Sequence, residues 1–171
     1  RQFTPGPEKA RYISFNGEEI PFGPQLLFQA AEMEDLIVAA EICEDVWSPV
    51  PPSIGAALEG ATVIVNCSAS DETIGKDTYR RELIAGQSAR HNIIAENGTI
   101  LKESNRYRNE IIYSEFDLER ITGERRKNTT FQTAQERSLI RVGFQIEKGE
   151  TSLTRTFPKK PFVPSDEQTR A

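Results

Sequence analysis

Short blocks of hydrophobic residues, separated by turn-forming residues, follow one another along most of the chain. Residues 10–15 (ARYISF) and 16–20 (NGEEI) have the pattern of a strand, an Asn-Gly turn and a returning strand, which is the strongest short hairpin signal. Residues 92–104 (NIIAENGTILKES) have the same pattern, with Asn97 and Gly98 at the tip. Both segments therefore predict antiparallel hairpins.

Two continuous hydrophobic runs predict strands inside a sheet. Residues 36–42 (LIVAAEI) and 61–67 (ATVIVNC) do not alternate with polar residues, as expected of strands covered on both faces. Between them, after the turn WSPVPPS, residues 54–60 (IGAALEG) predict a short helix capped by Ser53. This order predicts two neighbouring parallel strands whose carboxyl ends meet at one edge of the sheet, where ligands collect and where Cys43 lies.

The remaining hydrophobic patterns predict further helices and strands, so the chain is predicted to have an α/β fold. Residues 23–34 (GPQLLFQAAEME) predict a helix with proline in its first turn, and residues 77–90 (DTYRRELIAGQSAR) predict another. Strands are predicted at 110–116, 138–146 and 151–157.

Composition limits the class of protein. With 171 residues, 37% hydrophobic and 27% charged, the chain suits one globular domain, predicted at 1–157. Residues 158–171 (PKKPFVPSDEQTRA) are proline-punctuated and charged, which indicates a linker. The net charge of −5 gives no basic footprint for nucleic acid. No run is long enough to span a membrane and no signal peptide is evident, so a cytoplasmic protein is expected.

The two cysteines and the single histidine exclude a disulfide framework and the usual zinc ligand sets, so no metal site is expected.

One junction between two predicted elements is irregular. The predicted helix ending at Arg90 runs into the strand that starts near His91 without a connector, although helix-to-strand connections take several residues. Residues are therefore expected to be missing between Arg90 and His91.

Cys43 is the candidate nucleophile of the chain. A cysteine attacks as its thiolate, and it needs a base or a positive neighbour and donors that hold the oxyanion. A strand-end turn supplies backbone N–H groups, and Glu44, Cys67, Ser68 and Ser70 follow the ends of the same two strands. Buried packing is the favoured interpretation of an isolated cysteine after an apolar strand, because free cysteine is among the most buried residue types. Spacing alone leaves both interpretations open, and Cys67 is expected to be buried packing.

Four segments, taken in order, resemble the nitrilase-type glutaminase domain of the glutamine-dependent NAD synthetase family: EICEDVWSPVPPS, GATVIVNCSAS, YRRELIAGQSAR and HNIIAENGTIL. The resemblance covers nearly the whole chain. It implies an αββα sandwich of the nitrilase type, incomplete because the N-terminal part is absent and a gap follows Arg90. PFVPSD resembles the family's linker toward an ATP-using synthetase domain, which is absent here.

The family hydrolyses the glutamine side-chain amide through a cysteine thioester, with a Glu–Lys–Cys triad, and supplies ammonia for conversion of deamido-NAD to NAD. Cys43 matches the nucleophile. The triad Glu and Lys precede the cysteine in the family, and Glu8 and Lys9 do not match their motifs. The chain is therefore expected to begin after both and to have little or no glutaminase activity by itself.

The resemblance also implies substrate contacts and partners. Glu44 and Ser70 match positions that contact glutamine, and Lys76 could add a cation for its carboxylate. A solvated strand-end carboxylate, a turn residue and a solvated helix face are the corresponding alternatives. No cofactor is expected in this domain, whereas ATP and Mg²⁺ are expected in the synthetase domain. Glutamine, that domain with its deamido-NAD, and further copies of the chain in a homo-oligomer are the expected partners.

Three other functions remain open from the sequence. One is another amidase of the carbon–nitrogen hydrolase superfamily, which would have no need of the PFVPSD linker. A second is a non-catalytic scaffold that docks on a synthetase, which the missing Glu and Lys favour. The third, a doubly wound nucleotide-binding domain, ranks last because both glycine-rich phosphate motifs are lacking.

Overall fold

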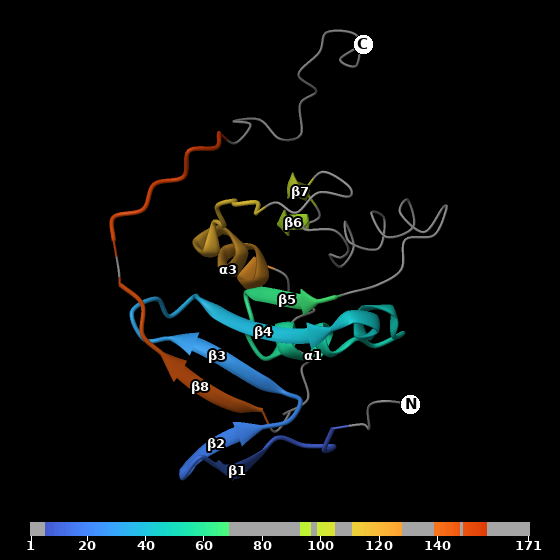
Figure 1. Ribbon diagram of the computed structural model, residues 1–171. Coiled ribbons are helices and arrows are strands. Elements are labelled where there is room, and N and C mark those ends of the chain that lie inside the picture. Colours follow the sequence, from blue (N-terminus) through green and yellow to red (C-terminus); the bar gives the residue numbers. More distant parts are fainter. Residues whose placement is uncertain are drawn as a thin grey trace, which may run out of the picture.

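The computed structural model describes residues 6–68, 93–96, 99–104, 111–127, 139–147 and 149–156. Within these ranges the protein is α/β: it has three sheets, one of them mixed, and two α-helices (Figure 1). Several predictions fall outside the described residues, namely the helix at 77–90, the junction after Arg90 and the linker at 158–171.

The N-terminal hairpin is confirmed. Strands β1 (Arg11–Phe15) and β2 (Glu18–Phe22) pair antiparallel, with Phe15 opposite Glu18. The two turn residues have positive φ values, 51° at Asn16 and 83° at Gly17, as the favoured two-residue hairpin turn requires. The hairpin therefore follows from its local sequence.

A four-stranded sheet with the order β5-β4-β3-β8 forms the centre of the structure (Figure 1). The predicted strands β4 (Ile37–Ile42) and β5 (Val63–Cys67) are confirmed and pair parallel. Strand β8 (Ile140–Phe144) lies within the segment predicted at 138–146 and pairs parallel with β3 (Leu26–Ala30).

The helix predicted at 23–34 is wrong, because β3 occupies the middle of that segment. The hydrophobic spacing fits either structure, but β3 pairs along its length with β8 and antiparallel with β4. Leu27 and Ala30 are buried, at 0% and 2% exposed. Positive φ values at Gly23 and Gln25 also oppose a helix start there. Long-range pairing outweighs a weak helical preference in this segment.

One face of the central sheet is covered by helix α1 (Pro52–Leu58), which confirms the predicted short helix. The buried core cluster consists of Leu27, Ala39, Ala56 and Ala61. The other face is not covered as the continuous runs predicted, because Ala40, Ile42 and Val65 are exposed. Ser53 is not the cap of α1 either: Pro51 holds that position, and the Ser53 N–H donates to Glu41 Oε2 at 3.2 Å.

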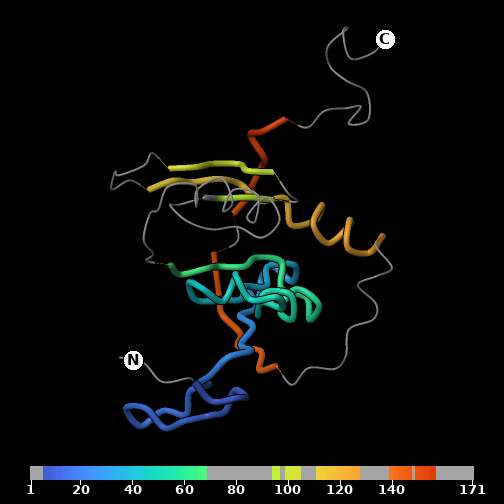
Figure 2. The backbone as a smooth tube through the Cα atoms, turned by 90° about the vertical axis from the view of Figure 1, so that its right-hand side faces the viewer, coloured from blue at the N-terminus to red at the C-terminus, as the bar shows by residue number. Residues whose placement is uncertain are grey.

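The second predicted hairpin is confirmed by β6 (Ile93–Glu96) and β7 (Thr99–Glu103), which pair antiparallel and lie beyond the β5 edge of the central sheet (Figures 1 and 2). The strands predicted at 110–116 and 151–157 are wrong for their described residues, which form no strand. Helix α3 (Leu118–Lys127) was not predicted from the sequence. Its charged residues hide the weak apolar pattern, of which only Ile121 is buried.

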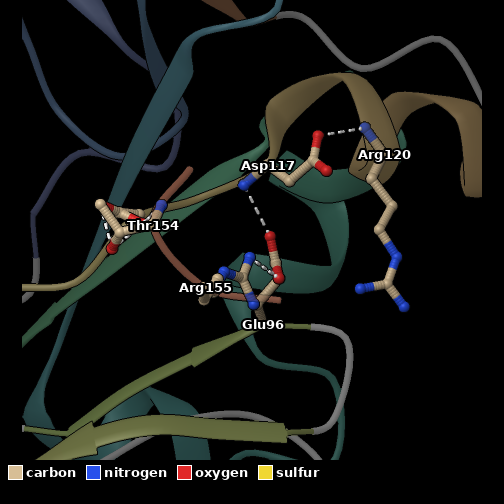
Figure 3. A network of polar contacts seen from close by, with 6 residues as sticks. Glu96, Asp117, Arg120, Thr154 and Arg155 are labelled. Carbon is tan, nitrogen blue, oxygen red and sulfur yellow. Dashed lines mark hydrogen bonds and ion pairs between the residues drawn. The ribbon is translucent and has the colours of Figure 1, made fainter. Parts of the chain in front are cut away.

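A buried carboxylate ties three of these segments together (Figure 3). The Glu96 side chain, at the end of β6, is 1% exposed and forms an ion pair with the guanidinium of Arg155. Glu96 Oε1 also accepts a hydrogen bond from the Asp117 N–H at 2.8 Å. Asp117 in turn caps α3, because its Oδ1 accepts from the Arg120 N–H at 2.9 Å. One carboxylate therefore joins β6, the start of α3 and the segment 149–156.

Glu115 makes a second contact with the segment 149–156. Its carboxylate accepts hydrogen bonds from the Thr154 N–H at 2.8 Å and from the Thr154 hydroxyl at 2.9 Å. The backbone bond first, and the hydroxyl bond second, hold the pKa of Glu115 below its ordinary value. A carboxyl with a lowered pKa contributes its stabilisation above the unfolded pKa and loses it as the pH falls through the folded value.

Replacing Thr154 by valine is expected to raise the pKa of Glu115 part of the way back to its ordinary value, because the hydroxyl donor is lost and the backbone N–H remains. The measurement is an NMR titration of the Glu115 carboxyl in the wild type and in Thr154→Val. The same midpoint in both proteins would contradict the assigned cause.

Candidate active site

Cys43 lies directly after β4, at the first position of the 3₁₀ helix η1 (Cys43–Trp47). Its φ is +52°, in the left-handed region that a residue with a side chain rarely adopts. Such a conformation costs of order 1–3 kcal/mol and persists only where the surrounding structure enforces it. Cys43 is half-buried, so the residue is neither core filler nor fully solvated.

Local contacts hold this strained turn. The Ile42 N–H donates to Asp45 Oδ2 at 2.9 Å, and the Ser48 N–H donates to the Asp45 carbonyl at 3.1 Å. Val46 anchors the same turn in the interior at 1% exposure. The turn is therefore fixed on both sides of Cys43, as a positioned nucleophile requires.

The end of β5 brings a hydroxyl to the thiol. Ile42 of β4 pairs with Cys67 of β5, so the next residues of both strands emerge side by side. The Ser68 hydroxyl donates to Cys43 Sγ at 3.5 Å. The sequence placed Ser68 at this edge without a role, since only the strand register shows which residue reaches the sulfur.

The described residues therefore bring together a strained strand-end turn, a half-buried cysteine and a hydroxyl donor. This arrangement can present a sulfur nucleophile to a ligand at the carboxyl ends of parallel strands. None of the described residues forms a cluster of three or more His, Cys, Asp or Glu side chains able to hold a metal ion.

Comparison with known proteins finds relatives that share one name. No family model matches it. It is 35% identical over 201 residues to the glutamine-dependent NAD(+) synthetase of Mycobacterium leprae and 33% identical to that of Mycobacterium tuberculosis strain H37Rv, in each case over 98% of this chain. The human glutamine-dependent NAD(+) synthetase is 34% identical over 67 residues, or 39% of the chain. The chain is homologous to part of a glutamine-dependent NAD(+) synthetase.

The chain spans 30% of the length of the mycobacterial synthetases. Their alignments extend over 201 positions, whereas the chain has 171 residues. The synthetases therefore carry residues inside the matched region that have no counterpart in this chain. The gap expected after Arg90 stays a prediction.

The structure describes only some of the other residues predicted near the site. Glu44 directly follows Cys43 and is exposed, which fits both a substrate contact and a solvated strand-end carboxylate, so its role stays a prediction. Ser70 and Lys76 lie outside the described residues. The prediction that Cys67 is buried is wrong, because it is exposed at the end of β5 on the open face of the sheet.

None of the helices in the described ranges is long and apolar enough to cross a membrane.

Replacing Cys43 by glycine is expected to give a protein more stable than the Cys43→Ala variant, by about 0.5–1 kcal/mol. Both substitutions remove the thiol, but glycine adopts the positive φ of this position without steric strain, and that gain exceeds its greater entropy loss on folding. Urea unfolding of the two variants measures the difference. Equal stability, or a more stable alanine variant, would show that Cys43 is not strained in solution.

Proposed function

We propose that this chain supplies the nucleophile site of a glutamine-hydrolysing NAD synthetase, with Cys43 as the nucleophile. The observation that carries the proposal is the strained turn itself: a half-buried cysteine at positive φ, directly after a strand, with the Ser68 hydroxyl at its sulfur. Backbone strain of this kind clusters at active sites. The names of the mycobacterial relatives supply the substrate class, glutamine.

The proposed reaction has two halves. The Cys43 thiolate attacks the carbon of the glutamine side-chain amide, and the resulting oxyanion needs donors. The carbon–nitrogen bond then breaks as the nitrogen takes up a proton. Ammonia departs, and the acyl group remains on Cys43 as a thioester. Water attacks the thioester, releases glutamate and returns the thiol. In the family that this chain resembles, a Glu serves as base and a Lys steadies the oxyanion, and no residue of this chain matches their motifs.

Substrate contacts follow from charge. Glu44 is exposed beside the nucleophile, and its carboxylate suits the α-ammonium of glutamine. Ser70 and Lys76, just beyond β5 in the sequence, would hold the α-carboxylate through a hydroxyl and a cation.

The domain organisation of the full-length protein is proposed from the resemblance to the family. Residues 1–157 would belong to an αββα domain of the nitrilase type, and 158–171 to the linker toward the synthetase domain, with the whole protein a cytoplasmic homo-oligomer. The ammonia would serve the ATP-dependent conversion of deamido-NAD to NAD. ATP and Mg²⁺ would be used in the synthetase domain, as the resemblance to the family implies.

The deciding experiment measures ammonia release and NAD formation by the full-length protein, comparing wild type with Cys43→Ala. An amidase of another specificity would release ammonia from a different amide without forming NAD. A scaffold would keep its glutamine-dependent activity after loss of the thiol. The 171-residue chain tested alone is expected to release little ammonia, because a cysteine without its base is a weak nucleophile.

A further inference from the structure

Glu41 is a buried carboxylate that the proposed reaction does not use. It lies in β4, two residues before Cys43, and is 4% exposed. Both of its oxygens accept hydrogen bonds: Oε2 from the Ser53 N–H at 3.2 Å and Oε1 from Asn66 Nδ2 at 3.1 Å. The carboxylate therefore binds the first turn of α1 and the neighbouring strand β5.

The second of these bonds leads to the nucleophile. Asn66 pairs with Glu41 in the parallel register of β4 and β5, and its Nδ2 also donates to the Cys43 carbonyl at 3.3 Å. The amide group thus holds the main chain of the one residue in this turn that has a positive φ. A path of two hydrogen bonds connects the Glu41 carboxylate to the strained peptide.

A carboxylate at this position does something that an apolar residue would not. Burying a carboxylate is unfavourable unless it is hydrogen-bonded, and an apolar side chain would fill the same space without that requirement. A carboxylate only accepts hydrogen bonds, so it turns the donor end of the Asn66 side chain toward itself. The same donor end then faces the Cys43 carbonyl.

We propose that Glu41 is a positioning residue for Cys43: through Asn66 it holds the Cys43 carbonyl and so keeps the thiol in its reactive orientation. The inference rests on the proposed function, because it assumes that Cys43 is the nucleophile. A misplacement of about 1 Å at a reacting group can reduce a rate by about 100-fold.

The test is Glu41→Gln in the full-length protein. The substitution keeps the size of the side chain but replaces one acceptor oxygen by an NH₂ donor, which then faces either the Ser53 N–H or Asn66 Nδ2, both of them donors. With glutamine as nitrogen source, kcat for NAD formation is expected to fall about 10- to 100-fold. KM for glutamine should change by less than about threefold, since substrate contacts are not removed. NAD formation from ammonium should be unchanged.

Glu96→Gln is the matched control, because Glu96 is also a buried carboxylate that accepts from one backbone N–H and one side chain, but in the other polar network. Its glutamine-dependent kcat should equal that of the wild type, even where its unfolding temperature falls. A Glu41→Gln protein with wild-type kcat, or an equal loss of kcat in Glu96→Gln, would overturn the positioning role. Retained glutamine use by Cys43→Ala would instead refute the proposed function.

The double variant Glu41→Gln with Asn66→Asp separates positioning from folding. The new amide in β4 can donate to the new carboxylate in β5 and still accept from the Ser53 N–H, so the link between the strands returns and stability should recover. The new carboxylate has no donor for the Cys43 carbonyl, so glutamine-dependent kcat should stay at least about tenfold low. Recovery of both stability and kcat would overturn the proposal. This variant also decides the question if Glu41→Gln alone fails to fold.

Discussion

Replacing Cys43 by alanine in the full-length protein is expected to abolish NAD formation from glutamine and to leave NAD formation from ammonium unchanged. Removal of the thiol leaves no atom to form the thioester, so the glutamine-dependent rate should fall by at least about 1,000-fold. Ammonium bypasses the thioester, because in the proposed function the synthetase chemistry takes place in another domain. The measurement is NAD formed per minute with each nitrogen source, together with ammonia released from glutamine.

Cys67→Ala is the matched control for this loss. Cys67 is the other thiol of the chain and ends the neighbouring strand β5, but it is exposed and its side chain has no proposed role. Both activities should survive its removal. Full glutamine-dependent activity in Cys43→Ala would end the nucleophile proposal, whereas an equal loss with both nitrogen sources would give Cys43 a structural role.

The second large effect is expected at the buried ion pair. Replacing Arg155 by methionine should destabilise the protein by about 3 kcal/mol, because the Glu96 carboxylate stays buried without its cation. The expected loss lies at the lower end of the range for breaking a buried ion pair, because the Arg155 side chain is 24% exposed. Urea unfolding, followed by the fluorescence of the single tryptophan, measures the change.

Two further variants show whether the uncompensated charge causes the loss. Adding Glu96→Gln to Arg155→Met should restore part of the stability, because no buried carboxylate then remains. Lys127→Met breaks an exposed ion pair, in which the side chains of Lys127 and Glu124 are 75% and 54% exposed. This variant should change the free energy of unfolding by less than about 1 kcal/mol. Equal effects of Arg155→Met and Lys127→Met would contradict the importance of burial.

The sequence by itself determined the features that depend on neighbouring residues. The turn at Asn16 and Gly17 predicts its hairpin because these residue types adopt positive φ at low energy. The continuous runs that became β4 and β5 were recognisable, as was the short helix between them. The place of Cys43 at a strand end followed from the same pattern. The relation to glutamine-dependent NAD synthetases was indicated separately, by the resemblance of four sequence segments.

The tertiary structure alone decided the features that depend on distant partners. Residues 26–30 form a strand because β8 and β4 pair with them, and hydrophobic spacing along one segment carries no information about such pairing. The sequence showed Glu41 only as one charge in an apolar run, whereas the register of β4 and β5 gives it Asn66 as a partner and connects it to Cys43. Hydrogen bonds between strands are set by register and side-chain direction, which exist only once the chain has folded.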